Sequence, residues 1–194
     1  MVVGVDEAGR GPLAGVVVAC ALHLKKDPPF TVKDSKKLSA SAREEIFSWL
    51  TKEAVFGVGT ASNQEIDEIN ILEATLLAFN RAIEKLLERS SKLKKAKFIV
   101  DGNHFRSDLE LNYICQPKAD TFVKEVSCAS IVAKVVRDYL MNSVDFLYPQ
   151  WNFSQHKGYP TAEHFSLIKK YDLTPFHRCS FSPCKNGLGK KQGV

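Results

Sequence analysis

Two adjacent carboxylates near the start of the chain are the residues best suited to chemistry. Asp6 and Glu7 follow an apolar run at 1–5 and lead through Ala8 into the turn Gly9-Arg10-Gly11. Carboxylate oxygens are the ligands that Mg²⁺ and Mn²⁺ prefer, and free amides in a glycine turn beside an arginine bind phosphate or sugar oxygens. A metal site and a polyanion site at one place indicate phosphodiester chemistry. An acid pair at a strand end is also common on protein surfaces, so this motif needs support from elsewhere.

Two other acids lie where they could share a metal with this pair. Asp101 ends the apolar stretch 97–101 and is followed by a glycine, as in the first motif. Asp120 lies in the first turn of a helix that we expect from about residue 119. If the two acid-bearing strands are neighbours, their terminal carboxylates face the same opening of the sheet. Each acid alone is explained as a solvated end of a strand or helix, but Asp6, Glu7, Asp101 and Asp120 together are not.

Asp138 competes with Asp120 for the fourth position, and helix geometry separates the two. They are 18 residues apart, which is about five turns and ~27 Å along a straight helix, so one centre cannot hold both. The helix dipole helps to keep Asp120 ionised near the N-terminus. Lys134, one turn before Asp138, is a sufficient structural partner for that acid. We therefore choose Asp120.

The pairing of Asp6 with Glu7 raises a geometric difficulty, because consecutive strand side chains point to opposite faces. Both can reach one site only if the strand ends at Asp6 and the longer Glu7 bends back around the turn. The sequence Gly9-Arg10-Gly11 permits such a path.

The order of apolar patterns and caps predicts an α/β fold with a mixed sheet. Ligands in such folds gather at the carboxyl ends of strands, and the antiparallel opening argues against a dinucleotide-binding fold. We expect two strands within 1–24 around a turn at 9–12, the second at 13–24; a helix from a Ser41–Glu44 capping box to about residue 50; a strand at 54–61; a long helix capped by Asn70; strands at 97–101 and 111–115; a long helix from about 119; and a helix to about 171 capped by Thr161.

The composition is that of one ordinary globular domain. The chain has 194 residues, 44% of them hydrophobic, and no stretch approaches the ~20 apolar residues of a membrane span. Acids at positions 6 and 7 stand where a secretory leader would be apolar, so we expect neither leader nor anchor. Five scattered cysteines without a Cys-x-x-Cys pair favour free thiols in the cytoplasm over a zinc site or a disulfide framework.

The net charge of +5 is concentrated at 85–97 and near the C-terminus. Positive charge beside acidic metal ligands suits an enzyme of nucleic acids. The run at 85–97 is explained equally well as a solvated helix end whose lysines favour the dipole. We expect residues 185–194 to form a basic tail, for which disorder is one interpretation.

Taken in order, these motifs resemble those of one known family, ribonuclease HII, the bacterial type 2 ribonuclease H. The match runs from residue 2 to about 184. It rests on Asp6-Glu7-Ala8-Gly9-Arg10-Gly11-Pro12, Asp34-Ser35-Lys36-Lys37-Leu38-Ser39, Asp101-Gly102-Asn103, Lys118-Ala119-Asp120, Ala129-Ser130-Ile131-Val132-Ala133-Lys134-Val135-Val136-Arg137-Asp138, His156-Lys157-Gly158-Tyr159-Pro160-Thr161 with His164, and His177-Arg178-Cys179-Ser180-Phe181.

The resemblance implies a ribonuclease H-like fold over 1–184, with a five-stranded mixed sheet flanked by helices and a C-terminal helical extension. It implies that the four acids, Asp6, Glu7, Asp101 and Asp120, are catalytic and coordinate two divalent ions, Mg²⁺ or Mn²⁺. It further implies that Gly9, Arg10 and Gly11 contact the ribose 2′-OH, that Tyr159 packs on the following sugar, and that Lys36 or Lys37 touches a phosphate.

The activity implied by the resemblance is endonucleolytic hydrolysis of the RNA strand of RNA/DNA hybrids. The enzyme would also nick on the 5′ side of single ribonucleotides embedded in duplex DNA, leaving 3′-hydroxyl and 5′-phosphate ends. We expect a monomer that binds these nucleic acids and no membrane. The related type 3 enzymes carry lysine in place of Arg10 and an added N-terminal domain, so type 2 is favoured.

Other interpretations of the same residues stay open at this point. Another nuclease of this fold, such as a junction resolvase or an integrase-like strand transferase, need not recognise a 2′-OH. A non-catalytic nucleic-acid-binding module would use only the basic surface. His156, His164 and His177 lack a ligand spacing, and we expect His164 to pack or to cap a helix.

Overall fold

The computed structural model describes residues 1–30 and 38–186, which form a five-stranded mixed sheet with helices on both faces. The strand order is β3-β2-β1-β4-β5. β1 is antiparallel to β2 and parallel to β4, β2 is antiparallel to β3, and β4 is parallel to β5. The strands are β1 Val2–Ala8, β2 Val17–Leu24, β3 Ala54–Ala61, β4 Lys97–Asp101 and β5 Asn112–Gln116. The predicted fold class is therefore confirmed.

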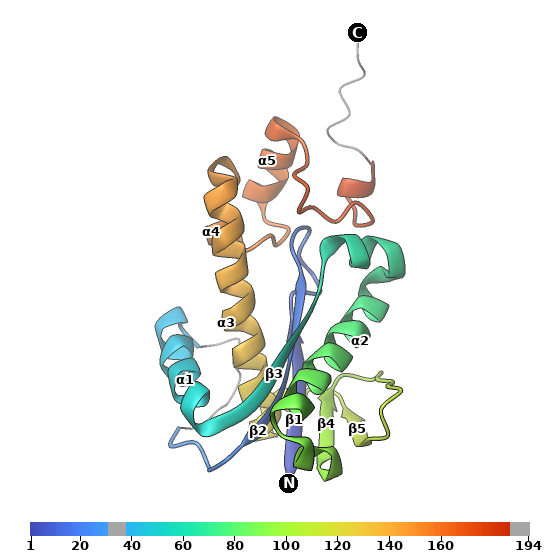
Figure 1. Ribbon diagram of the computed structural model, residues 1–194. Helices are drawn as coiled ribbons and strands as arrows, with labels where there is room; N and C mark the ends of the chain where they lie inside the picture. Colours follow the sequence, from blue (N-terminus) through green and yellow to red (C-terminus); the bar gives the residue numbers. More distant parts are fainter. Residues whose placement is uncertain (31–37, 187–194) are drawn as a thin grey trace.

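The helices form two layers and a C-terminal extension. Figure 1 shows the sheet between α2 on one side and α1 with α3 on the other. The helices are α1 Ala40–Glu53, α2 Asn63–Arg89, α3 Lys124–Leu147, α4 Phe153–His156 and α5 Ala162–Tyr171, with short 3₁₀ turns η2 Ser91–Lys95, η3 Ala119–Thr121, η4 Pro149–Trp151 and η5 Cys184–Asn186. α5 lies at the end of the molecule toward which β1 runs (Figure 1).

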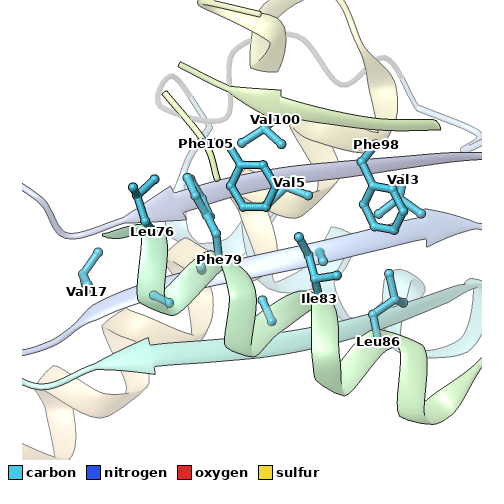
Figure 2. Packing of buried hydrophobic residues seen from close by; sticks show 14 of the residues in the cluster. Val3, Val5, Val17, Leu76, Phe79, Ile83, Leu86, Phe98, Val100 and Phe105 are labelled. Atoms are coloured by element: carbon cyan, nitrogen blue, oxygen red, sulfur yellow. The ribbon is translucent and has the colours of Figure 1, made fainter. Parts of the chain in front are cut away.

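The larger apolar core lies between α2 and the sheet. Figure 2 shows one face of α2 turned toward the strands. Four of its residues, spaced by three and four, are buried there: Leu76, Phe79, Ile83 and Leu86. They pack with the alternate, inward-facing residues Val3, Val5, Phe98 and Val100 of β1 and β4. These two periodicities are what an amphipathic helix on a sheet requires, and they hold β1 and β4 side by side.

The predicted starts of β2 and α1 are wrong, the first because of tertiary hydrogen bonds and the second because another residue caps the helix. β2 begins at Val17 and not at 13, since Leu13 N donates to Gly158 O at 2.7 Å and Gly15 N donates to Phe176 O at 2.8 Å. α1 begins after Ser39, whose side chain accepts from Ala42 N, so the predicted Ser41–Glu44 capping box is not the start of this helix.

Asn70 caps a helix as predicted, but the helix element begins earlier. α2 starts behind a Ser62–Glu65 capping box and is interrupted at Asn70, where φ is 69°. The Asn70 side chain accepts from Leu72 N at 2.9 Å and from Glu73 N at 3.2 Å. Asn70 is therefore the N-cap of the segment that packs on the sheet, and the turns before it were not predicted.

In the parts of the chain that the structure describes, no helix is long and apolar enough to cross a membrane. The predicted tail at 185–194 begins within η5, and 187–194 lie outside the described residues. Its separation from the domain stays a prediction.

Candidate active site

A pocket of about 360 Å³ opens at the carboxyl ends of β1 and β4. The parallel register pairs Val5 with Val100, so the next residues on the two strands, Asp6 and Asp101, lie side by side. Adjacent parallel strands thus deliver two acids to one opening, as predicted. The pocket is lined by Asp6, Glu7, Ala8, Gly9, Arg43, Asp101, Ser130, Lys134 and Tyr159.

Glu7 reaches the pocket by a different route from the one predicted. β1 does not end at Asp6 but continues to Ala8, and Glu7 remains paired with Ala19 of β2. Both acids nevertheless line the pocket. The backbone N–H of Glu7 donates to Asp6 Oδ1 at 2.7 Å, which turns the Asp6 carboxylate toward its neighbour. The prediction that the strand must end at Asp6 was wrong. The two acids nevertheless converge on one pocket, as expected.

Burial, together with neighbouring carboxylates, raises the pKa values of Asp6 and Glu7. Burial, then the charges of Glu7 and Asp101, raise the pKa of Asp6 well above its usual value, against hydrogen bonds from Glu7 N–H and Ser130. Burial also raises the pKa of Glu7, with Asp101 adding to the effect and Arg10 opposing it. Arg10 lies 3.7 Å from the Glu7 carboxylate. Buried carboxylates that repel each other are the environment that a divalent cation stabilises, and their oxygens are its preferred ligands.

The acids do not form a closed metal cage by themselves. Within residues 1–30 and 38–186, no three His, Cys, Asp or Glu side chains are grouped closely enough to hold an ion. Mg²⁺ commonly keeps several waters and takes one or two carboxylates together with substrate phosphates. An open pocket that offers three carboxylates therefore fits a divalent ion that shares its ligands with a bound nucleic acid.

Asp120 lies in a turn that is hydrogen-bonded to Asp101 and not in the helix where the sequence placed it. It belongs to the 3₁₀ turn η3, and α3 begins only at Lys124. Asp120 is 4% exposed and is not among the residues that line the pocket. The preceding residue, Ala119, donates its N–H to Asp101 Oδ1 at 2.8 Å. The predicted position in the first turn of a long helix was wrong, although η3 is directly tied to one of the pocket acids.

Two buried arginines, for which no role was predicted, bind the loop between β1 and β2, and Arg178 among them holds the glycine turn. Arg178 donates to the carbonyls of Gly9 at 2.6 Å, Arg10 at 3.0 Å, Pro12 at 2.8 Å and Gly15 at 2.9 Å. Arg137 donates to three further carbonyls, those of Ala14, Val16 and Lys157. Burial, with Arg137 nearby, lowers the pKa of Arg178 to about 9. Because the carbonyls of the turn are directed at Arg178, its peptide units have a fixed orientation.

The turn itself requires glycine at its first position. Gly9 has φ +99°, and a Cβ there would meet the Arg137 side chain at 2.1 Å. Among the described residues, no atom lies within 4 Å of a Cβ placed on Gly11, and both Gly11 and Arg10 are exposed. The buried half of the turn is therefore fixed by the arginines, and the other half is open to a ligand.

Tyr159 also lines the pocket. Its side chain is 37% exposed, and the ring lies 5.8 Å from Lys134 Nζ and 5.6 Å from Arg137 Cζ, measured to the ring centroid. Lys134 pairs with Asp138 at 2.6 Å, which is the partner predicted for that acid. Arg43, Ser130 and Lys134 were missed as pocket residues. The spacing of Ser130 and Lys134 by four on one helix face could have indicated the last two.

The lysine predicted to touch a phosphate, Lys36 or its neighbour Lys37, lies outside the described residues. Its role stays a prediction.

Comparison with known proteins agrees with these motifs over almost the whole chain. The profile of the family described as Ribonuclease HII matches residues 3–184. The chain belongs to the ribonuclease HII family. The ribonuclease HII of Polynucleobacter asymbioticus is 47% identical over 189 residues, which cover 96% of this chain and 95% of that protein. The chain is accordingly an enzyme, a type 2 ribonuclease H and an endonuclease of the hydrolase class.

Solved structures of ribonucleases H share the fold. The ribonuclease H2 of Pyrococcus horikoshii has a TM-score of 0.72 at 28% identity over 96% of each chain. Bst-RNase HIII in complex with Mn²⁺ has a TM-score of 0.71 at 20% identity, over 96% of this chain and 68% of that one. The second similarity concerns the fold alone. Together they show that these proteins share the overall fold of this chain.

Proposed function

We propose that this ribonuclease HII cleaves the RNA strand of RNA/DNA hybrids and nicks duplex DNA on the 5′ side of a single embedded ribonucleotide. The observation that carries the proposal is the convergence of Asp6, Glu7 and Asp101 in one pocket with the glycine turn and Tyr159. Water adds across the phosphodiester, a new P–O bond forms, and the bond from phosphorus to the 3′ oxygen breaks. The products are a 3′-hydroxyl and a 5′-phosphate.

We assign divalent ions, Mg²⁺ or Mn²⁺, to the carboxylates of this pocket. Asp6, Glu7 and Asp101 would hold them, with Asp120 as the fourth ligand supplied from η3. When bound, a pair of such ions supplies activation of the attacking water and stabilisation of the leaving oxygen. The raised pKa values of Asp6 and Glu7 support this assignment, as does the Mn²⁺ complex of the structurally similar Bst-RNase HIII.

The chain's own groups select the ribonucleotide. Arg178 binds the carbonyls of the glycine turn on the buried side, which leaves the amides of the exposed half able to face a sugar. Rigid backbone amides of this kind can detect the 2′-OH that distinguishes RNA from DNA. Arg10 and Lys134 would attract the adjacent phosphates, and Tyr159 would pack on the following deoxyribose.

The biological setting follows from the substrate. We propose that the enzyme acts as a monomer on hybrids and on ribonucleotide-containing DNA in the cytoplasm. All cysteines in the described part of the chain are free thiols, which fits a reducing compartment.

The test is cleavage of a duplex that carries one ribonucleotide, with Mg²⁺ and Mn²⁺ titrated separately. We expect a single nick at the 5′ side of the ribonucleotide that EDTA abolishes. The control is the same duplex made only of DNA. Absence of the nick, or equal cleavage of the control, would reject the proposal in favour of another nuclease specificity on this fold.

A further inference from the structure

Three histidines that the proposed chemistry does not use are buried and linked to Tyr159 by hydrogen bonds. His156 and His164 bond its backbone directly, and His177 bonds His164. His164 and His177 are 0% and 1% exposed, and His156 is 7% exposed. The rings of His156 and His164 are stacked with centroids 4.3 Å apart. They belong to α4, α5 and the segment after α5, which together form the C-terminal extension. Two of them, His156 and His164, are hydrogen-bonded to the backbone of Tyr159, whose side chain lines the pocket.

The hydrogen bonds of His177 and His164 fix where each ring carries its proton. Thr174 donates its N–H to His177 Nδ1 at 2.9 Å, so the proton of a neutral His177 is on Nε2. His177 Nε2 lies 3.0 Å from His164 Nε2, which must then accept. His164 therefore carries its proton on Nδ1 and donates it to the carbonyl of Tyr159 at 3.0 Å. Burial lowers the pKa of both histidines to about 4, so the neutral forms assumed in this assignment dominate near pH 7.

The backbone of Tyr159 is held on several sides at this point. Its carbonyl accepts from Thr161 N at 2.8 Å as well as from His164, and its N–H donates to His156 O at 2.8 Å. The preceding Gly158 has φ +80°, and a Cβ there would lie 2.7 Å from Ala14 O. These contacts set the point from which the half-exposed ring enters the pocket.

The same segment also holds the glycine turn. His177 is followed directly by Arg178, which binds the carbonyls of Gly9 and Arg10. The dipeptide His177-Arg178 therefore anchors two elements. His177 holds Tyr159 through His164, and the guanidinium of Arg178 holds the turn proposed to contact the 2′-OH. The relative position of the two substrate-facing elements depends on this short piece of chain.

Building on the proposed function, we propose that His164, oriented by His177, is a positioning residue that sets Tyr159 against the glycine turn. It thereby determines the preference for a ribonucleotide followed by DNA. His164 does not touch the substrate. Its effect on specificity acts through the carbonyl and hence the backbone position of Tyr159.

The test compares two substrates for each variant. The measured quantity is kcat/KM for a duplex with one ribonucleotide divided by kcat/KM for a uniform RNA/DNA hybrid. His164→Leu removes the donor to Tyr159, and we expect the ratio to fall by about fivefold, the scale of one hydrogen bond. In His164→Asn the amide nitrogen takes a place close to Nδ1 and can still donate, so we expect most of the ratio to return. Both substrates are cleaved by one preparation, so a partly unfolded variant does not alter the ratio.

His23→Asn is the matched control, because His23 Nδ1 lies 2.7 Å from the backbone oxygen of Val2, at the opposite end of β1 and β2 from the pocket acids. We expect this control to keep the parent ratio, and Tyr159→Ala to lower it. A lowered ratio for Tyr159→Ala with a parent-like ratio for both His164 variants would overturn the positioning role and leave the proposed function standing. A parent-like ratio for Tyr159→Ala itself would overturn the junction role of Tyr159, and the positioning role with it. Equal losses on both substrates in His164→Leu, without recovery in His164→Asn, would show a merely structural effect.

Discussion

Asp6 and Glu7 show how one strand can supply two acids to one pocket. Their side chains start on opposite faces of β1, yet both line the pocket at the end of the sheet. The bond from Glu7 N–H to Asp6 Oδ1 and the longer side chain of Glu7 make this possible without breaking the strand. The result is a buried negative charge that a divalent cation would compensate.

Removing the charge of Asp6 or Asp101 should abolish turnover while keeping nucleic-acid binding. For Asp6→Asn and Asp101→Asn we expect the single-turnover cleavage rate to fall by roughly 10²-fold or more, because each loses an ion ligand. Binding of the hybrid, measured in EDTA by gel shift, should be unchanged or stronger because repulsion of the phosphates is reduced. Asp108→Asn, an exposed acid away from the pocket, is the control. Loss of binding in step with cleavage would contradict this.

The roles of Asp120 and Asp138 can be distinguished by replacing each with asparagine in turn. Asp120→Asn should lower cleavage at least about tenfold, because loss of even an outer-shell partner of a metal ligand typically costs that much. Asp138→Asn should change it less, because that acid already pairs with Lys134. Rates are compared at saturating Mg²⁺ and again across a metal titration, in which Asp120→Asn should need more metal. A larger defect in Asp138→Asn would reverse the assignment.

At the scale of elements, the loop between β1 and β2 is shaped by the C-terminal extension. Its carbonyls bind Arg178 from one side and Arg137 of α3 from another. A third apolar cluster, which includes Leu13, Trp151 and Ile168, packs the same loop against η4 and α5. The extension is therefore part of the site, because it determines the conformation of the turn that faces the ribose.

Arg178→Lys tests this arrangement, because it keeps the charge but loses the directed donors. Several buried carbonyls would lose partners, so we expect the free energy of unfolding to fall by about 2–4 kcal/mol. We also expect weaker discrimination between a ribonucleotide and a deoxyribonucleotide at the cleavage position. Urea unfolding and paired cleavage assays measure the two effects. Arg89→Lys, which loses one exposed bond to Phe56 O, is the control and should change neither. Unaltered stability in Arg178→Lys would contradict the argument.

For the whole molecule, the two buried histidines of the C-terminal extension make the stability of the fold depend on pH. Burial lowers the pKa of His164 and His177 to about 4 in the fold, against about 6.5 in an unfolded chain. The unfolded state therefore binds more protons between these values. The stability that neutral histidines contribute is complete above about pH 6.5 and is lost as the pH falls toward 4. His156 adds to the lowering, whereas Glu163 and Asp172 oppose it.

This predicts a steeper acid sensitivity for the parent than for His164→Asn. In EDTA, the thermal midpoint of the parent should fall more between pH 7 and pH 5 than that of the variant. The raised pKa values of Asp6 and Glu7 act in the opposite sense, but they are common to both proteins and cancel in the comparison. Differential scanning calorimetry in matched buffers measures the difference. If the thermal midpoints of the parent and of His164→Asn fall by the same amount between pH 7 and pH 5, His164 does not contribute to the acid sensitivity.

The sequence by itself determined the order and type of the main elements and the acids that follow two of the strands, because these depend on local information. Apolar periodicity placed the strand at 54–61 and the one at 97–101 as β3 and β4 have them, and Thr161 capped α5 as predicted. Parallel pairing of β1 with β4 then brought Asp6 beside Asp101.

Only the tertiary structure decided how the remaining groups meet. The path of Glu7, the placement of Asp120 in η3 and the start of β2 at Val17 depend on partners far along the chain. The bonds from Arg178 to the loop between β1 and β2 span 163 to 169 residues. Residue types and short spacings contain no record of such contacts, because they form only when the extension folds back onto the end of the sheet.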